Sequence, residues 1–431
     1  TGAYAFAGPG IAANGAGRAT GIYRVPHLRV ESYCVYTNKA VCSAFRAPGT
    51  AQTNFAIESH IDALARRLGL DPLEMRMKNM LQEGDKGPGG LMMNNIYLKE
   101  TIEAAVNLAN FKEEKQQKNR GKGMGVAFWQ TGGMASSACV KLNEDGTVGF
   151  TTGAVDVSGS HTSLQQMLAE VMGIERGDVV IQMGDTDTAP HSPQSGGSQI
   201  TRSVGASMLR AAEEVRRKIF ELAAELLEAN IDDLELRAHR VSVKGSPHIG
   251  LTLKEVAQKS HQWKKGPILG EASHSSLPAV PSFCTEIAEV EVDPETGQVD
   301  LLRMICALDV GMAINPLQVE GQIEGGVVQG IGYALSEEIV YGEDGRVKNP
   351  NFLDYKIPVS LDVPKIESVL IERPTHIESP FGMKGVGEPP IVPTAAAIAN
   401  AVYDAIGVRV HDLPITADKI VKALKEKSEN R

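Results

Sequence analysis

The chain has few cysteines, no paired cysteine motif and no long apolar run. Its 431 residues contain five scattered cysteines and no C-x-x-C pair, which argues against an iron–sulfur cluster or structural zinc held by this chain. No run of about 18 apolar residues occurs, so no membrane-spanning helix is expected. The first residues show no secretory signal pattern. Because the cysteine count is odd, we expect reduced thiols and a cytoplasmic location.

Clustered positive charge is also lacking. The chain has 43 Lys and Arg against 53 Asp and Glu, and its basic residues are dispersed. A nucleic-acid partner would need a concentrated basic face, so we expect a small-molecule ligand and neither nucleic acid nor membrane. The length allows two or three lobes. The chain begins at Thr1, without a methionine, in a Gly/Ala-rich stretch, so we expect one piece or subunit of something larger.

Strand and helix patterns alternate without a strict βαβ rhythm. Strands are expected at residues 22–41, 123–152, 179–183 and from 284 to about 309, with 284–293 half-buried. Helices are expected at residues 52–68, 204–229, 252–259 and 323–340. Another helix is expected to open at residue 71, one to end at residue 173, one to end near residue 406, and one to begin after residue 416. This pattern predicts an α+β fold with two lobes of mixed sheet and flanking helices. The charged stretch 112–122 is the expected boundary, which gives 1–115 and 116–431.

Two side-chain environments are predicted from local position. His161 stands at a helix start, where local hydrogen bonding is expected. Arg76 and Lys78 are expected on a solvated helix face.

Four loops rich in Gly, Ser, Thr or Pro stand out, at residues 45–52, 153–162, 195–201 and 382–388. The first three lead into helices, whose first backbone N–H groups form natural anion sites. The loop 195–201 is the best phosphate candidate, because it combines bare glycine amides with three hydroxyls. No loop matches G-x-x-x-x-G-K-[ST] or a G-x-G-x-x-G after a strand, which disfavours an ordinary nucleotide fold.

The last of these loops presents a single acid. Glu388 follows three glycines in six positions, and two prolines come after it. Glycine lets the backbone approach a ligand closely, and proline stiffens the exit. A rigid loop of this kind suits a general base, although a negative charge placed at a helix start is the alternative.

Several short stretches follow one another in a fixed order and together span almost the whole chain. They are Ala44-Phe45-Arg46 with Gln52, Asn143-x-Asp145-Gly146, Gly159-x-His161-Thr162, Ser198-x-x-Thr201, Asp309-Val310-Gly311 with Asn315-Pro316, Gly321-Gln322-x-Glu324-Gly325 with Gln329-Gly330-x-Gly332, and Gly385-Val386-Gly387-Glu388-Pro389-Pro390. Together they resemble the molybdenum hydroxylases, the xanthine dehydrogenase and aldehyde oxidoreductase family.

The resemblance implies the C-terminal portion of a molybdopterin-binding large subunit, with residues 1–115 completing the first molybdopterin-binding lobe. The implied cofactor is molybdenum held by a pterin dithiolene, as molybdopterin or its cytosine dinucleotide, so no side chain need ligate the metal. The implied partners are the remaining part of the molybdopterin domain, an iron–sulfur subunit and a flavin subunit with FAD, in a dimer of the complex. The chain is expected to be inactive alone.

The resemblance also implies roles for individual residues. Glu388 matches the catalytic base, a role that burial would support by raising its pKa. Phe128 matches an aromatic residue that lines the substrate pocket, and Asn14 stands where purine-oxidising relatives have arginine. The positions implied to contact the pterin or lie beside the metal are Arg46, Asp156, Ser158, Gly197, Ser198, Thr201, Gln322 and Gly385.

Three departures from the family pattern leave the substrate open. Besides Asn14, Pro48 replaces an aromatic residue, and Val157-Ser158-Gly159 replaces Gly-Gln-Gly. The implied reaction is hydroxylation of an electron-poor carbon in an N-heterocycle, purine-like, or in an aldehyde. Carbon monoxide oxidation and a non-catalytic scaffold of the same fold remain alternatives. A hydrolase is disfavoured, because no Ser or Cys lies in a convincing nucleophile motif.

Overall fold

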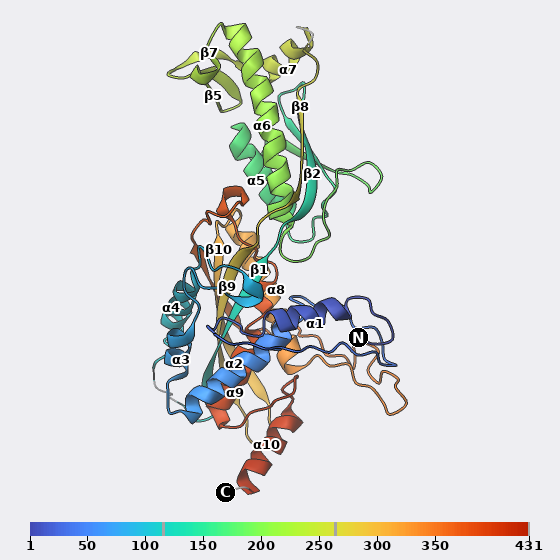
Figure 1. The fold of residues 1–431 in the computed structure, drawn as a ribbon, viewed down its shortest axis with the longest axis vertical. Coiled ribbons are helices and arrows are strands. Elements are labelled where there is room, and N and C mark those ends of the chain that lie inside the picture. The colour runs from blue at the N-terminus through green and yellow to red at the C-terminus, as the bar shows by residue number, and fades with distance from the viewer. Residues whose placement is uncertain (114–116, 263–264, 430–431) are drawn as a thin grey trace.

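The computed structural model describes residues 1–113, 117–262 and 265–429, and its elements form two parts stacked along the long axis (Figure 1). The helices are α1 (Gly8–Gly17), α2 (Thr50–Arg67), α3 (Pro72–Asn79), α4 (Leu98–Leu108), α5 (Ser160–Met172), α6 (Ile200–Leu227), α7 (Leu253–Gln262), α8 (Pro316–Leu335), α9 (Thr394–Ile406) and α10 (Ala417–Glu429). Short 3-10 turns are η1 (Pro88–Gly90), η2 (Arg176–Asp178), η3 (Ile231–Asp233), η4 (Pro380–Gly382) and η5 (Pro389–Ile391). The α+β prediction is confirmed.

The strands form three sheets. They are β1 (Arg120–Thr131), β2 (Met134–Leu142), β3 (Val148–Thr152), β4 (Val179–Met183), β5 (Leu234–Arg237), β6 (Arg240–Val243), β7 (Ser246–Thr252), β8 (Leu269–Ser276), β9 (Val280–Val292), β10 (Val299–Gly311) and β11 (Lys365–Glu372). The sheet orders are β1-β9-β10-β11, β4-β3-β2-β8 and β5-β6-β7. In the first sheet β10 pairs with β11 in parallel, while the other two pairings are antiparallel.

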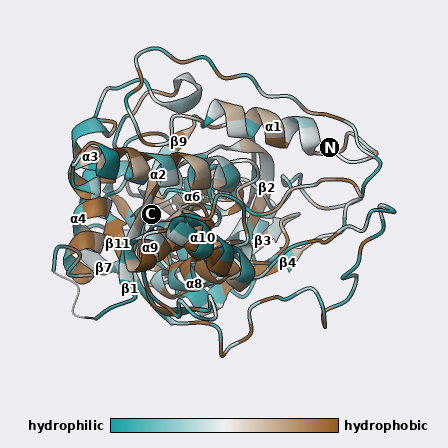
Figure 2. Ribbon diagram, turned by 90° about the horizontal axis from the view of Figure 1, so that it is seen from below, coloured by the Kyte–Doolittle hydropathy of each residue, from teal (hydrophilic) through white to brown (hydrophobic). Residues whose placement is uncertain are grey.

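The first sheet is covered on both faces. Helices α8 and α9 share a buried cluster with one face, and α4 shares a second cluster with the other. Helix α9 packs very closely on β1, as shown by Gly123, where a Cβ would collide with the backbone of Ala397 and Ala401. Glycine at alternate positions of β1 and small residues on α9 together permit this close approach. Figure 2 shows α9 as a hydrophobic element and α10 with both polar and apolar residues.

The second part of the fold packs α5 and α6 on the sheet β4-β3-β2-β8. The chain passes between the two parts twice, from β1 to β2 and from β8 to β9. Helices α2, α3 and α4 share a core with β1, β9 and β10. The predicted boundary at 115/116 lies outside the described residues and remains a prediction. No described helix combines the length and apolar character needed to cross a membrane.

Local signals predicted several elements well. Asp71 caps α3 by accepting hydrogen bonds from Leu73 N (2.8 Å) and Glu74 N (2.9 Å). Helix α5 ends at Gly173, which has a positive φ of 60°. Helix α6 was predicted at residues 204–229 and runs from Ile200 to Leu227, so it begins earlier than predicted, directly after the long polar loop.

Three secondary-structure predictions were wrong in whole or in part. Residues 22–41, all described, contain no strand and only isolated bridges, because their alternating apolar residues find no neighbouring strand to pair with. Residues 284–293 are buried on both faces along most of β9, since this strand is central in its sheet. Helix α8 begins before the predicted start, at Pro316, because the Asn315 side chain accepts from Gln318 N.

The prediction for Arg76 was also wrong. Its side chain is fully buried and its Nε donates to Glu58 Oε2 at 2.9 Å, whereas Lys78 on the same helix is exposed. His161 does bond locally, since its Nε2 lies 2.8 Å from Ala154 O.

Candidate functional site

The loops singled out in the sequence meet around a cavity of about 550 Å³. Its lining comes from both parts of the fold and from segments more than 300 residues apart in the chain. The lining includes Phe45, Arg46, Ser158, Ser160, Gly196, Gly197, Ser198, Thr201, Gln318, Gln322, Lys384, Gly385 and Glu388. The structure thus brings together eight of the eleven residues to which the resemblance assigned a role.

Arg46 ties the first loop to the last. Its Nε donates to the carbonyl of Gly387, and its Nη2 donates to Gln322 O at 3.0 Å and lies 3.3 Å from Gln322 Oε1. The loop can turn into α2 because Gly49 takes a positive φ of 78°. One guanidinium therefore fixes the loop before α2, the helix α8 and the Glu388 loop in one geometry.

Glu388 is held at both carboxylate oxygens. Its Oε1 accepts from Ala47 N at 3.1 Å, and its Oε2 accepts from the Ser198 hydroxyl at 3.1 Å. The same Ser198 oxygen accepts from Glu388 N at 2.9 Å. The carboxylate is therefore oriented by two separate loops, with part of its surface left open to the cavity.

The environment of Glu388 raises the affinity of its carboxylate for a proton. Burial raises the pKa of its carboxyl above the usual 4.5, while bonds from Ala47 and Ser198 and the charge of Arg46 oppose the rise. Burial prevails, so the group binds a proton more readily than an exposed glutamate does. Such a carboxylate suits general-base catalysis.

The loop before α6 presents open backbone amides to the cavity. Gly197 and Ser198 both have positive φ, 77° and 59°. A Cβ placed on Gly196 would meet nothing within 4 Å, so a ligand can approach the backbone there. The first residues of α6, including Thr201, line the cavity together with Ser160 at the start of α5. These helix starts favour negative charge in the cavity.

Gly385 marks a tight contact between loops. Its N–H donates to Thr131 Oγ1 at 3.0 Å, and a Cβ there would collide with Thr131 and Ser198. A bare glycine is therefore needed for the Glu388 loop to close against the end of β1 and the loop before α6.

A buried ion pair supports the Glu388 loop from behind, and the sequence analysis missed it. Lys384 Nζ lies 2.7 Å from Asp309 Oδ2, with both side chains fully buried. The ammonium also donates to Asn95 O at 2.7 Å. Burial raises the pKa of Asp309 to about 6. Asp309 lies near the end of β10 in one of the stretches that carry the resemblance, and Lys384 lies in the loop 382–388. Opposite charges in these two segments could have signalled the pair.

Asp156, Phe128 and Asn14 do not line the cavity in the part of the chain that the structure describes. Asp156 instead accepts from His161 N at 3.3 Å, at the start of α5. The structure places Phe128 away from this cavity. Its ring packs against Phe283 in the core beneath α4, because strand alternation turns Trp129 to the opposite face.

Asn14 lies on α1, where its side chain approaches Gly49. The aromatic residue that does line the cavity is Phe45, which stacks on Tyr333 with ring centroids 6.1 Å apart. Phe45 belongs to the stretch Ala44-Phe45-Arg46. The sequence alone did not indicate that its side chain lines the cavity.

Comparison with known proteins gives matches over most of the chain. Two models described as molybdopterin cofactor-binding domains match residues 1–80 and 100–364. The xanthine dehydrogenase molybdenum-binding subunit of Escherichia coli O157:H7 is 34% identical over 97% of this chain and 58% of its own length. The gamma subunit of the 6-hydroxypseudooxynicotine dehydrogenase complex of Paenarthrobacter nicotinovorans is 33% identical, over 94% of this chain and 54% of its own.

A solved structure agrees with these relatives. The crystal structure of quinoline 2-oxidoreductase from Pseudomonas putida 86 has a TM-score of 0.90 and 30% identity, and the match covers 96% of this chain and 57% of that one. The chain thus spans a little over half the length of the relatives it matches.

Proposed function

Because the chain belongs to the molybdopterin cofactor-binding domain family, we propose that it is part of a molybdenum-dependent hydroxylase. The proposed reaction inserts a water-derived oxygen at an electron-poor carbon of an N-heterocycle. The observation that carries the proposal is the carboxylate of Glu388, held by Ala47 and Ser198 in the wall of a cavity lined by helix starts.

The cavity residues fit a pterin cofactor that carries negative charge. Open amides at Gly196 and Gly197 and the first turn of α6 would hold its anionic groups. Ser158, Ser198, Thr201 and Gln322 offer hydroxyl and amide groups around the same cavity, and Arg46 supplies a positive charge. When bound, the molybdenum cofactor supplies the redox chemistry.

In this proposal the chain contributes binding, orientation and one proton acceptor. Glu388 takes a proton from the attacking oxygen, because its carboxylate is aimed by two hydrogen bonds and its pKa is raised. Arg46 keeps the Glu388 loop and α8 in register through Gly387 and Gln322. The ion pair between Lys384 and Asp309 holds the base of that loop.

The substrate class is proposed from the relatives. Their printed names refer to xanthine and quinoline, which are N-heterocycles with an electron-poor ring carbon. Phe45 offers an aromatic face in the cavity, which can stack on a planar ring. Partner chains are proposed to carry the iron–sulfur and flavin groups that accept the electrons. The complex is proposed to form a dimer and to lie in the cytoplasm.

The test is a substrate comparison in the complete complex. N-heterocycles, aldehydes and carbon monoxide would be supplied with a dye as electron acceptor, and molybdenum would be measured on the same sample. We expect turnover of at least one N-heterocycle to exceed that of every aldehyde and of carbon monoxide. Gly197→Val is the matched control, since a branched side chain at positive φ blocks the amides and should lower molybdenum content and turnover together. A metal-loaded complex that turns over none of these compounds would contradict the proposal.

Ser198 should set the pH at which the base becomes active. Ser198→Ala removes a hydrogen bond that stabilises the charged carboxylate of Glu388, so the pKa of Glu388 should rise further. A base works only when deprotonated, and activity is lost as pH falls through its pKa. The acidic limb of the pH–rate profile should therefore move to higher pH. An unmoved limb, or one moved to lower pH, would contradict the assignment.

The matched control for that experiment is Ser195→Ala. Ser195 lies on the same loop and lines the cavity, but its hydroxyl does not appear among the groups that bond Glu388 in the described chain. Its acidic limb should stay in place.

A further inference from the structure

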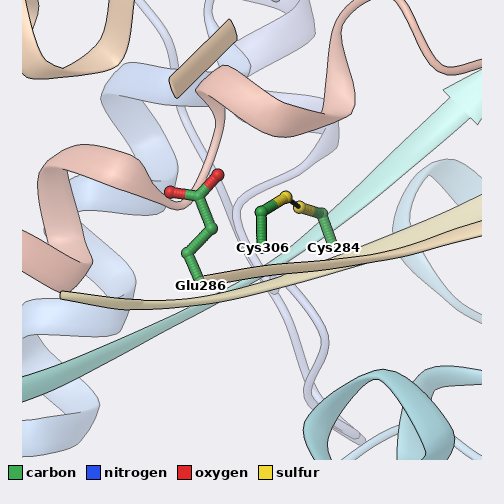
Figure 3. A group of neighbouring side chains, drawn as sticks. All are labelled: Cys284, Glu286 and Cys306. Atoms are coloured by element: carbon green, nitrogen blue, oxygen red, sulfur yellow. Dashed lines mark hydrogen bonds between the residues drawn. The ribbon is translucent and has the colours of Figure 1, made fainter. Parts of the chain in front are cut away.

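Two thiols and a carboxylate are buried together in the central sheet, outside the cavity described above. Cys284 and Glu286 lie on β9, and Cys306 lies on β10 directly opposite Glu286. Figure 3 shows the three side chains rising from the same face of the two strands. The two sulfurs are 3.5 Å apart. The potential ligand atoms of all three residues lie within 4.8 Å of one another, and each side chain is completely inaccessible to solvent.

The carboxylate of Glu286 has no well-formed hydrogen bond in this environment. Among the described residues no donor reaches either oxygen in regular hydrogen-bond geometry, and the Thr394 hydroxyl and the Cys306 thiol stabilise its charge without overcoming the effect of burial. The nearby Thr394 hydroxyl donates instead to Pro390 O at 3.0 Å. Burial raises the pKa of Glu286 to about 8, while contacts with Thr394 and Cys306 oppose the rise. What the geometry offers a cation is two sulfurs and a carboxylate oxygen within 4.8 Å of one another.

We propose that Cys284, Glu286 and Cys306 bind one thiophilic d¹⁰ cation, with zinc as the ion that fits their chemistry. Thiolate sulfur and carboxylate oxygen are both ordinary zinc ligands. Two thiolates at the usual Zn–S distance of about 2.3 Å stand roughly 3.8 Å apart in a tetrahedral site, close to the 3.5 Å found here. The ligands need small side-chain movements and no change in strand register.

The charge balance also favours a divalent ion. Zinc displaces one proton from each thiol, and the two thiolates formed cancel its double positive charge. The loaded cluster then carries no more charge than the Glu286 carboxylate alone, while each ligand atom gains a partner. Because the site is sealed from solvent, the ion would enter during folding and would link β9 to β10 below η5, the turn that follows Glu388.

The sequence pattern did not indicate this site. Zinc sites are usually recognised in a sequence by cysteines two to four residues apart. Cys284 and Cys306 instead lie on the two antiparallel strands β9 and β10, with the turn between these strands separating them in the chain. Strand pairing alone brings them together.

The test is zinc stoichiometry in the complete complex, produced with zinc present and then dialysed against a chelator. We expect about one zinc per copy of this chain, lost in Cys284→Ser and Cys306→Ser. The matched controls are Cys34→Ser and Cys42→Ser, whose thiols are exposed and whose loss should leave the zinc in place. Absence of zinc from the unchanged protein, or zinc retained in both buried variants, would overturn the proposal.

Two further measurements keep the proposal testable if the buried serine variants fail to fold. Glu286→Gln keeps the side-chain shape and should release zinc to the chelator more readily than the unchanged protein. Protein produced with Co²⁺ should show a thiolate-to-cobalt charge-transfer band. Equal zinc retention in Glu286→Gln and the absence of that band would count against the site, as would a mass loss of two hydrogens that marks a disulfide between the sulfurs.

Discussion

Replacing Glu388 with glutamine is expected to lower turnover of the complete enzyme by about 10²–10⁴-fold, the usual worth of a general base. Glutamine keeps the shape of the side chain and can still bond Ala47 N and the Ser198 hydroxyl. It cannot accept the proton. Molybdenum content should stay near that of the unchanged protein, because the proposed cofactor contacts lie mainly on the loop before α6 and on α8.

The experiment separates two roles for this acid. Glu388 stands immediately before η5, a turn of three residues, so it could be no more than a charge at a helix start. In that case the substitution would cost about 1 kcal/mol of stability or less and leave the rate unchanged. Turnover and molybdenum should be measured on the same sample, with the exposed Glu338→Gln as a control. Full metal with near-normal turnover would remove Glu388 from the mechanism.

The parts of the site that could be predicted from sequence are those encoded by short local patterns. The glycines around Glu388 indicate a close approach of backbone, and Gly385 does pack against Thr131 and Ser198. The Gly/Ser-rich loop before residue 200 indicates a helix start with open amides, which the structure has. Glycine-rich loops and helix starts depend on residues that are close in the chain, so they can be predicted without knowledge of tertiary contacts.

The features that were missed depend on pairing between distant segments. Phe128 and Trp129 are buried on opposite faces of the sheet. Which of them lies on the side of α4 follows from the register of β1 against β9, and a shift of one residue would exchange them. The apolar alternation at residues 22–41 resembles a strand, yet no second strand lies beside it. Lys384 and Asp309 are 75 positions apart, and only the folded loop joins them.

Arg76 shows the same limit for a charged residue. An arginine on a short amphipathic helix is usually solvated, and nothing near it in sequence indicated otherwise. Its partner Glu58 lies on the preceding helix, and the pair is covered by the Tyr23 segment and by β1. The pair is buried only because α2, α3, β1 and the segment around Tyr23 come together in the folded chain.

That network leads to the largest stability effect we expect. Arg76 donates to Glu58 Oε2 at 2.9 Å, to Pro72 O at 3.0 Å and to Met124 O at 3.3 Å. Glu58 in turn accepts from Val126 N at 3.0 Å and from the Tyr23 hydroxyl. The opposite charge of Glu58 raises the pKa of Arg76 above its usual value even though burial lowers it. Neither side chain has access to water.

Arg76→Met should therefore lower the free energy of unfolding by about 3–5 kcal/mol, the usual cost of leaving one charge of a buried pair uncompensated. The double variant Arg76→Met with Glu58→Gln should recover part of this loss, since the remaining neutral amide costs less to bury than a carboxylate. Lys78→Met on the same helix is exposed and should change stability by no more than about 0.5 kcal/mol. Urea denaturation of all three variants would measure these differences. A loss for Arg76→Met no larger than that for Lys78→Met would mean that the pair does not hold α2, α3 and β1 together.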